Sequence, residues 1–571
     1  MKKIKFFEVP DITSVRDMLK KSTQTFGSKL ALEDLSSTPI SSVTYRQLLE
    51  NVMRFGAALQ KLGLSERAHI AVIGENRVQW GIAYLAALAF NYVVVPIDKN
   101  LHSNEIFNII HESDSEAIIF SDTFAPVMKE GSGVLKKLRF FISMDLPSKK
   151  ENVYSMTEMI NNSRPADINE LPAINPDDTA EIIFTSGSLG RAKGVMLTQK
   201  NLASNLMSMT SMVKITSEDR FLSVLPIHHT YECTCGFLCP LFMGSSVHYA
   251  RSLKTVVDDL QNVKATILLG VPLLFDKMFK RISKTISEDK VKSKVVPPLL
   301  KLTGLIEKAG VGGVKKKVFK ELHHKFGGSI RIFIAGGAAP DPEVAKGLRE
   351  FGFNFIQGYG LTETSPILTL NQLDNFKDDA AGIPLSGVEL RINNPDPEGR
   401  GEVWAKGPNV MKGYYKNQKL TDEVFDNGWF KTGDIGFMDK DGFLHISGRM
   451  KNVIIANNGK NVFPEEIEDI LNRSPFVLES LVYGEKDAKH DEIIAAQIVT
   501  DSEAFIEYSG NNNLQITDEL ITEIIDGVIK DVNKQLASFK QIKKYYIRDG
   551  EFEKTTTQKI KRYLVNQGEQ A

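Results

Sequence analysis

The chain has 571 residues, of which 25% are charged and 42% hydrophobic, and its formal net charge is −1. This is ordinary globular composition, with enough length for more than one domain. The balanced charge gives no overall basic field, so nucleic acid is not expected as a partner. The only cysteines are Cys233, Cys235 and Cys239. They exclude a disulfide framework and, with no signal-like apolar run at the N-terminus, predict a cytoplasmic protein.

The first part of the chain alternates between helical and strand patterns. Thr44 and Gln47 form a capping-box pattern, after which apolar residues recur at helical spacing. Strands and helices alternate with short connections between them, which indicates a parallel sheet covered by helices, an α/β fold. The predicted strands are residues 69–73, 92–95 and 117–120, and the predicted helices are 80–90 and 105–111.

The longest apolar stretch, residues 80–97, is the nearest approach to a membrane span. Gly81 and Pro96 interrupt it, and its second half is β-branched. A helix followed by a buried strand is therefore the favoured interpretation. No transmembrane segment is expected, and peripheral contact with a membrane is left open.

The middle of the chain continues the alternation and adds a basic segment. Residues 282–326 are rich in lysine and helical in pattern. A solvated helix face is the ordinary explanation of such lysines, and a basic surface that faces a membrane is the alternative. Further strands are predicted at 221–225, 266–269, 331–335 and 354–356.

After residue 380 the pattern changes to short strands and turns. We predict a large N-terminal domain of parallel sheets covered by helices plus a β-rich subdomain, residues 1–448. A small α+β C-terminal domain, residues 449–571, is predicted to follow. The predicted elements are strands at 401–407, 493–499 and 545–547, a hairpin turn at 439–442, and helices from Pro464 and at 519–536.

A glycine- and hydroxyl-rich loop follows a predicted strand at 181–185. Glycines let backbone N–H groups converge on an anion, hydroxyls add donors, and Lys193 adds a positive charge for phosphate. The spacing is not that of the Walker loop, and a flexible turn is the alternative for this segment taken alone. The loop reads Thr185-Ser186-Gly187-Ser188-Leu189-Gly190-Arg191-Ala192-Lys193-Gly194.

Later segments carry complementary chemistry. Tyr359 and Glu363 supply a flat aromatic face and a carboxylate suited to a hard cation. Asp434 supplies a carboxylate that can accept from two O–H donors. The segments are Gly336-Gly337-Ala338, Tyr359-Gly360-Leu361-Thr362-Glu363-Thr364, Trp429-Phe430-Lys431-Thr432-Gly433-Asp434 and Gly448-Arg449-Met450-Lys451.

In this order the segments resemble the motifs of the adenylate-forming superfamily, which includes acyl-CoA synthetases, peptide-synthetase adenylation domains and luciferases. The resemblance covers nearly the whole chain, from residue 15 to residue 562. It implies ATP, Mg²⁺ and coenzyme A as cofactors, with Tyr359 stacked on adenine, Thr362 at the α-phosphate and Asp434 on the ribose. The residues implied to bind the nucleotide are Thr185, Ser186, Gly187, Ser188, Gly190, Lys193, Gly337, Ala338, Tyr359, Gly360, Thr362, Asp434 and Arg449, and those implied to hold Mg²⁺ are Thr185 and Glu363.

Three positions depart from the family's usual residues. Leu189 stands where a hydroxyl is common, and Ala192 stands where proline is common, so one phosphate donor is lost and the loop is less rigid. Gln558 replaces the glycine that precedes the family's adenylation lysine. The departures are the only features that favour a non-catalytic regulator that binds nucleotide or acyl groups.

Lys559 matches the adenylation lysine of the family. Its implied role is to stabilise the charge that builds up when a carboxylate attacks the α-phosphorus. Lys554 and Lys561 are rivals for this role. The alternative without any catalytic role is a lysine-rich tail that is simply solvated.

The resemblance also implies a hinge and a mobile C-terminal domain. Lys451 is the implied pivot. Rotation about it would remove Lys559 and bring in the segment around Gly459, where a glycine lets coenzyme A approach. One site would then run two half-reactions in turn.

Residues 225–232 resemble the segment that borders the family's carboxylate pocket. By register His229 gates or orients the acid, and a packed histidine is the alternative. A zinc site with the neighbouring cysteines is disfavoured, because Cys235 and Cys239 lie in an apolar run and read as buried thiols.

The lysine-rich stretch resembles bacterial long-chain acyl-CoA synthetases, which favours a medium- or long-chain fatty acid as the substrate. A carrier protein is the alternative acceptor to coenzyme A, and a luciferase-like oxygenase is an alternative by kinship alone. The sequence does not predict an oligomeric state.

Overall fold

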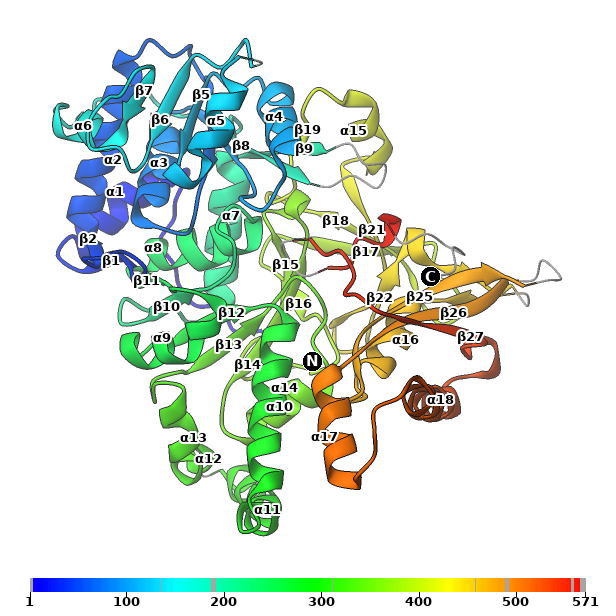
Figure 1. Cartoon of the computed structure of the whole chain (residues 1–571). Coiled ribbons are helices and arrows are strands. Elements are labelled where there is room, and N and C mark those ends of the chain that lie inside the picture. Colours follow the sequence, from blue (N-terminus) through cyan, green and yellow to red (C-terminus); the bar gives the residue numbers. More distant parts are fainter. Residues whose placement is uncertain are drawn as a thin grey trace. The chain divides into compact units, whose positions relative to one another are not determined.

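The computed structural model describes residues 4–133, 135–185, 192–310, 312–456, 459–487, 492–555 and 559–564 (Figure 1). The chain packs into two compact units. The first comprises Met1–Leu390, Ala405–Phe430 and Asp441–Leu444, and the second comprises Arg391–Trp404, Lys431–Lys440 and His445–Ala571. Arg449, the predicted boundary, lies within the second unit, and the predicted domain limits stay a prediction.

The first unit contains an eight-stranded sheet in the order β19-β9-β8-β4-β3-β5-β6-β7. Its strands from β8 to β7 run parallel to their neighbours, whereas β9 is antiparallel to β8 and β19 is antiparallel to β9. The strands are β3 (His69–Ile73), β4 (Val93–Pro96), β5 (Ala117–Phe120), β6 (Phe140–Ser143), β7 (Val153–Ser155), β8 (Thr179–Thr185), β9 (Lys193–Thr198) and β19 (Gly413–Tyr414).

A nine-stranded sheet in the same unit has the order β16-β15-β14-β13-β12-β10-β11-β1-β2. Its centre is parallel, and β2, β15 and β16 at its edges are antiparallel. The strands are β1 (Leu30–Asp34), β2 (Ser41–Thr44), β10 (Arg220–Ser223), β11 (Ser246–Tyr249), β12 (Ile267–Gly270), β13 (Ile332–Ala335), β14 (Phe355–Gly360), β15 (Ile367–Leu370) and β16 (Ile383–Pro384).

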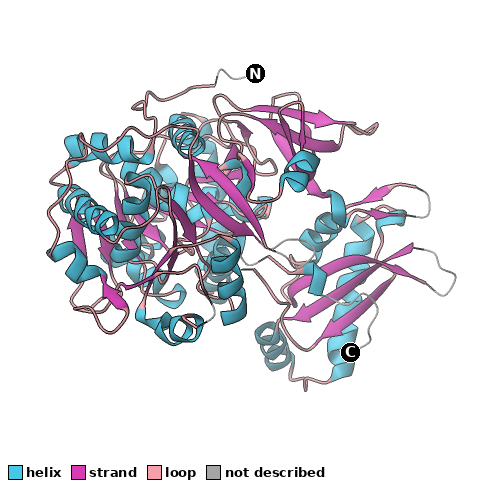
Figure 2. Cartoon of the chain, turned by 90° about the horizontal axis from the view of Figure 1, so that it is seen from above, coloured by secondary structure: helices cyan, strands magenta, loops and turns pink. Residues whose placement is uncertain are grey.

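Helices cover these sheets, and Figure 2 shows them on either side of the strands. The predicted capping box at Thr44 and Gln47 is present at the start of α2. The predicted α/β class is thus confirmed. The helices are α1 (Val15–Phe26), α2 (Tyr45–Lys61), α3 (Val78–Ala89), α4 (Ser103–Glu112), α5 (Ala125–Gly131), α6 (Met156–Asn161), α7 (Gln199–Met212), α8 (Cys239–Met243), α9 (Val256–Val263), α10 (Pro272–Glu288), α11 (Lys292–Lys308), α12 (Val314–Val318), α13 (Lys320–Lys325), α14 (Pro342–Glu350) and α15 (Gln418–Val424), with a π-helix at Tyr231–Leu238.

The apolar stretch 80–97 forms the buried helix α3 and the buried strand β4, as predicted. Both belong to the largest hydrophobic core of the first unit, where Trp80 stacks on Tyr84 and Phe237 packs edge-on against both rings. Within the described ranges, no helix combines the length and the apolar character that crossing a membrane requires.

The second unit ends in a three-stranded sheet, β25-β26-β27, whose helices bury its apolar face. A further five-stranded sheet has the order β17-β18-β21-β20, with β22 beside β21, and the division between the units passes through β17, β18, β21 and β22. The elements are β17 (Glu389–Asn393), β18 (Gly401–Lys406), β20 (Phe425–Asp426), β21 (Trp429–Met438), β22 (Leu444–Arg449), β23 (Ile454–Ile455), β24 (Asn461–Val462), β25 (Val477–Lys486), β26 (Glu492–Thr500), β27 (Lys544–Arg548), α16 (Pro464–Leu471), α17 (Ser502–Asn512) and α18 (Asp518–Gln535).

The π-helix Tyr231–Leu238 carries a carboxyl group into the core of the first unit. Glu232 is 1% exposed, and the hydroxyl of Ser223 donates to its Oε1 at 2.5 Å. Asn76 donates to Ser223 Oγ at 3.0 Å and to the carbonyl of Leu225 at 2.7 Å. Burial raises the pKa of Glu232 to about 8, against the opposing effect of the Ser223 hydrogen bond. This carboxyl group is therefore mostly protonated at neutral pH.

Stability should depend on the ionisation of Glu232. In the unfolded chain a glutamate ionises near pH 4.3, so the contribution of the neutral folded carboxyl is complete below about pH 4.3 and is lost as the pH rises toward the folded pKa of about 8. Glu232→Gln keeps the shape and removes the titration. The free energy of unfolding of the variant, relative to the wild type, should rise between these pH values by a few kcal/mol, roughly.

Denaturant unfolding across that pH range measures the difference, with the exposed Glu130→Gln as the matched control. A difference between Glu232→Gln and the wild type that stays constant with pH would show that the buried carboxyl does not titrate in this window.

Candidate functional site

Strands β8 and β9 close the predicted phosphate loop. Thr185 and Lys193 are partners in the antiparallel ladder, and both side chains are half-buried. The two ends of the loop are thus held side by side. The other predicted loop residues, Ser186, Gly187, Ser188 and Gly190, lie outside the described residues.

Tyr414 connects two residues that the sequence predicted separately. The ammonium of Lys193 lies 5.4 Å from the centre of the Tyr414 ring, and the Tyr414 hydroxyl donates to Glu363 Oε1 at 2.9 Å. The backbone of Glu363 is also fixed, because its carbonyl accepts from the Met411 N–H at 2.8 Å. The first unit therefore brings together the predicted phosphate lysine and the predicted metal ligand.

The carboxylate of Glu363 fits a magnesium ligand. The Tyr414 hydroxyl uses one lone pair of one carboxylate oxygen. A carboxylate has about four lone-pair sites, so the remaining sites can coordinate a cation. Hard oxygen donors of this kind are those that Mg²⁺ prefers. Glu363 is half-buried, which keeps the group accessible to a ligand.

Tyr359 and Gly360 are the last two residues of β14, and the glycine shapes this strand end. A Cβ added at Gly360 would lie 1.7 Å from the carbonyl oxygen of Pro366, so a side chain cannot fit there. Tyr359 pairs with Thr369 of β15, and Thr362 begins a short 3₁₀ turn. Tyr359 and Thr362 are half-buried at this strand end.

Gly337 and Ala338 follow the neighbouring parallel strand β13 and are exposed. Gly337 has φ of +88°, a conformation that favours glycine. A Cβ at the preceding Gly336 would lie 2.7 Å from the ring of Tyr231. Because β13 and β14 are parallel, both predicted nucleotide segments leave the same edge of the sheet.

The predicted His229 and its neighbour His228 have different environments. His229 is half-buried, and its Nδ1 accepts from the N–H of Tyr231 at 3.2 Å, so the neutral ring carries its proton on Nε2. His228 is buried, and burial, with a contribution from Lys99, lowers its pKa to about 3. Its contact with Asp98 at 3.6 Å is therefore made by a neutral ring. Of the two, His229 is the less buried.

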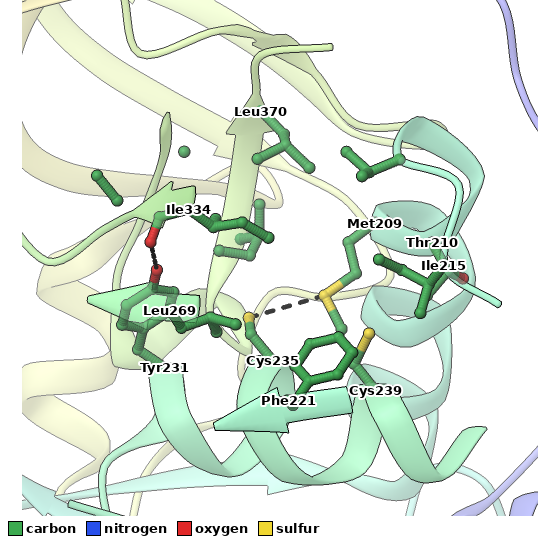
Figure 3. Close-up of a pocket in the computed structure, with 14 residues that line it drawn as sticks. Met209, Thr210, Ile215, Phe221, Tyr231, Cys235, Cys239, Leu269, Ile334 and Leu370 are labelled. Atoms are coloured by element: carbon green, nitrogen blue, oxygen red, sulfur yellow. Dashed lines mark hydrogen bonds between the residues drawn. The ribbon is translucent and has the colours of Figure 1, made fainter. Parts of the chain in front are cut away.

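An apolar cavity of about 50 Å³ lies beneath these strand ends (Figure 3). Tyr231 closes one side and donates its hydroxyl to the carbonyl of Ile334 at 3.0 Å. The thiol of Cys235 lies 3.7 Å from the sulfur of Met209. The lining residues come from α7 and the segment after it, β10, the π-helix, α8, β12, β13, β14 and β15: Met209, Thr210, Val213, Ile215, Phe221, Tyr231, Cys235, Cys239, Leu269, Ile334, Ala335, Gly358, Ile367 and Leu370.

The three cysteines are buried free thiols, as predicted. Burial raises the pKa of Cys235 far above its ordinary value, so its thiol is a neutral part of the cavity wall. In the part of the chain that the structure describes, no group of three or more His, Cys, Asp or Glu side chains is arranged to hold a metal ion.

In the second unit, Asp434 and Arg449 lie together. Asp434 is 4% exposed, and Arg449 Nε lies 2.7 Å from its Oδ1. The hydroxyl of Thr432 accepts from the Asp434 N–H at 3.1 Å and donates to the carbonyl of Val403 at 2.6 Å. Both predicted ribose contacts are therefore fixed at one point in this unit.

Lys451 and Gly459 lie in exposed segments of the second unit. Lys451 is in a short turn directly after β22. Gly459 has φ of +78° between β23 and β24, and apart from its chain neighbours no atom of the described residues lies within 4 Å of where its Cβ would be. Open space at this glycine suits the approach of another molecule.

The predicted catalytic lysine differs from one of its rivals. Lys559 is exposed, and two hydrogen bonds with Thr555 hold its backbone: the Lys559 N–H donates to the Thr555 hydroxyl at 3.1 Å, and the Lys559 carbonyl accepts from the Thr555 N–H at 2.7 Å. Lys554 is 2.7 Å from both Glu479 and Glu551. These ion pairs outweigh desolvation and raise the pKa of Lys554. Lys554 is thus a structural cation of this unit.

The site residues that sequence reasoning missed are Tyr414 and the cavity lining. Tyr414 follows a glycine in a short strand and looks like any core tyrosine, so only the fold reveals its hydroxyl beside Glu363. The cavity residues come from seven separate segments, and no local pattern joins them.

Comparisons with known proteins cover most of the chain. A family model described as AMP-binding enzyme matches residues 19–415, and one described as AMP-binding enzyme C-terminal domain matches residues 466–559. The chain is 29% identical to the long-chain-fatty-acid–CoA ligase FadD15 of Mycobacterium bovis, over 92% of this chain and 90% of the relative. It is 28% identical to AEE15 of Arabidopsis thaliana, a chloroplastic long-chain-fatty-acid–[acyl-carrier-protein] ligase, over 84% of this chain and 76% of the relative.

Among solved structures, the anthranilate CoA ligase AuaEII in complex with anthranoyl-AMP has the same fold. The TM-score is 0.78 at 20% identity, and the match covers 97% of each chain.

Tyr414→Phe should weaken the binding of Mg²⁺-ATP. The change removes the hydrogen bond to Glu363, and a hydrogen bond of this kind is worth about 0.5–1.5 kcal/mol, so we expect a roughly two- to tenfold rise in Kd. Calorimetric titration measures it. Tyr415→Phe is the matched control, because the Tyr415 hydroxyl donates to Asp114 instead. Equal effects of the two changes would mean that the Tyr414 hydroxyl has no particular role at Glu363.

Proposed function

The chain belongs to the AMP-binding enzyme family, the adenylate-forming acyl- and aryl-CoA ligases, and on this premise we propose that it activates a medium- or long-chain fatty acid for transfer to coenzyme A. In the first half-reaction a carboxylate oxygen attacks the α-phosphorus of ATP, which gives acyl-adenylate and pyrophosphate. In the second, the thiol of coenzyme A attacks the acyl carbon, loses its proton and releases AMP.

The observation that carries this proposal is the continuity of the apolar cavity with the nucleotide segments. Ala335 and Gly358 line the cavity, and each is followed within three residues by a segment that the resemblance assigns to the nucleotide. Tyr231 lines it two residues after His229. An acid whose carboxylate lies at the strand ends would therefore direct its hydrocarbon chain into apolar surroundings, where burial is favourable.

The size of the cavity bears on the length of the acid. A water-sized group needs about 10–15 Å³ by this measure, so the cavity of about 50 Å³ takes a few methylene groups as it stands. Met209 has a flexible side chain that can turn away to make room. The long-chain fatty acid in the name of the relative FadD15 supports a longer substrate.

The polar end of the acid has a suitable donor. His229, in the tautomer that carries its proton on Nε2, would donate to the substrate carboxylate. Lys193 is a cation for the phosphates, and Tyr359 offers a face for adenine. Mg²⁺, held by Glu363 and Thr185, would neutralise phosphate charge and favour attack at phosphorus.

The residues of the second unit have proposed roles that follow from the resemblance. Asp434 accepts hydrogen bonds from the ribose, with Arg449 beside it. Lys559 supplies the cation for the first half-reaction, Lys451 is the hinge, and Gly459 admits coenzyme A.

A carrier protein is the second candidate acceptor. The relative AEE15, named as an acyl-carrier-protein ligase, supports it. Both acceptors present a phosphopantetheine thiol, so the chemistry of the second half-reaction is the same. Measuring thioester formation with free coenzyme A and with a carrier protein that carries phosphopantetheine distinguishes the two acceptors.

A panel of acids with ATP, Mg²⁺ and coenzyme A tests the proposed function. We expect AMP release and thioester formation to be greatest with octanoate, laurate or palmitate, and small with acetate or benzoate. AMP release without a thioester would favour the carrier protein. A preference for acetate or benzoate, or no AMP with any acid, would overturn the fatty-acid proposal.

Substitutions in the cavity should move the preferred chain length in opposite directions. Cys235→Phe fills the cavity, so kcat/KM for palmitate should fall about tenfold or more relative to butyrate. Met209→Ala enlarges the cavity, so the optimum should move to longer acids. A uniform loss with all acids, in both variants, would mean that this cavity does not hold the acyl chain.

Lys559→Ala should slow the first half-reaction about 100-fold or more, because it removes a cation from the transition state. Thioester formation from supplied acyl-adenylate should be largely spared. Rapid-quench assays of the two half-reactions measure this, with Lys561→Ala as the matched control. An equal loss in both half-reactions would contradict the assignment of Lys559.

A further inference from the structure

Helix α11 presents an apolar stripe to solvent. The exposed fractions are 69% for Val291 at its N-cap, 50% for Val295, 53% for Leu302 and 65% for Leu305. Pro298 is exposed between them. With 3.6 residues per turn, these five positions fall within an arc of about 80° along one side of the helix.

The opposite side of α11 holds the helix on the protein. Val296, Leu299 and Leu300 pack against the core that contains Phe275. Thr303 on this side is 1% exposed. The exposed stripe is therefore additional to the face that the fold needs, and a solvated helix would not require it.

Positive charge surrounds the stripe. Residues 272–326, from α10 to the end of α13, contain 14 lysines and arginines and 5 acidic residues, a net charge of +9 in a chain whose total is −1. Lys294 and Lys301 flank the stripe and are exposed. Lys292 and Lys315 are paired, with Asp289 at 3.1 Å and with Glu307 at 3.0 Å. The excess of lysine over acidic partners makes this face basic.

We propose that α11 and the lysines around it dock the enzyme on an anionic lipid surface. The aliphatic stripe would enter the boundary between headgroups and acyl chains, and the lysines would meet anionic headgroups. This combination favours lipid over a second copy of the chain, because two faces of the same charge repel each other. It also favours lipid over nucleic acid, since the stripe offers aliphatic side chains where bases need aromatic or arginine partners.

The docking surface is separate from the candidate site. α10 leads from β12, whose Leu269 lines the apolar cavity, to α11 (Figure 1). Its 17 residues span about 25 Å. Substitutions on α11 therefore leave the cavity intact, and lipid binding is measurable without turnover. Docking at a membrane would place the enzyme where fatty acids are concentrated. Only this benefit, and not the docking itself, rests on the proposed function.

Sedimentation of the full chain with vesicles tests the proposal. We compare vesicles of phosphatidylcholine alone with vesicles that also contain phosphatidylglycerol. The wild type should bind the anionic vesicles and detach as NaCl is raised from about 0.1 M to about 1 M, because screening shortens the reach of charge. The double variants Lys294→Glu with Lys301→Glu, and Leu302→Ser with Leu305→Ser, should each lower the partition coefficient about tenfold or more.

Matched controls are Lys129→Glu with Lys136→Glu, and Leu253→Ser, which alter exposed residues elsewhere. They should bind as the wild type does, and all variants should keep the same turnover of octanoate. No vesicle binding by the wild type, or full binding by both α11 variants, would overturn the proposal. Concentration-dependent dimerisation that is lost in Leu302→Ser with Leu305→Ser, without vesicle binding, would assign the stripe to a second copy instead.

Discussion

The parallel pairing of β13 with β14 is the contact on which the candidate site depends. Ile334 pairs with Ile356 and Ala335 with Gln357, where β13 ends and β14 continues to Gly360. β13 is apolar to its end and Gly336 and Gly337 follow it at once, whereas the end of β14 itself contains Gly358 and Gly360. The same edge of the sheet therefore offers an apolar cavity below and exposed backbone above, which suits a molecule with a hydrocarbon chain and a charged head.

The helix that forms one wall of the cavity also buries a carboxyl group, which costs stability. The π-helix and the start of α8 place Tyr231, Cys235 and Cys239 at intervals of four residues along the cavity. The same helix buries Glu232, whose Oε2 has no hydrogen-bond partner among the described residues. Burial of a carboxyl group is tolerated when the group is neutral, and its hydrogen bond with Ser223 connects it through Asn76 to the segment that carries His229. The carboxyl thus supports the backbone on which the candidate acid-binding residue lies.

Local pattern was enough to predict much of the fold. The strand at 117–120 and the capping box at Thr44 were predicted as they occur, because burial and capping are decided by neighbours in sequence. The role of Tyr414 depends on strand β19, which joins a sheet formed some 200 residues earlier, and sequence spacing cannot predict such pairing. For the lysines of residues 282–326 the sequence allows two interpretations, a solvated helix face and a basic surface that faces a membrane. Only the exposure of the apolar stripe on α11 distinguishes between them, and sequence alone does not give that exposure.

The central claim is that one continuous site holds both the adenylate and the acyl chain. Calorimetric binding of non-hydrolysable acyl-adenylate analogues of increasing chain length tests it most directly, since no turnover is needed. Each buried methylene is worth about 0.8 kcal/mol, so the affinity should rise about fourfold per methylene until the cavity is full. An affinity that does not change with chain length would contradict the account, because the chain would then lie in water.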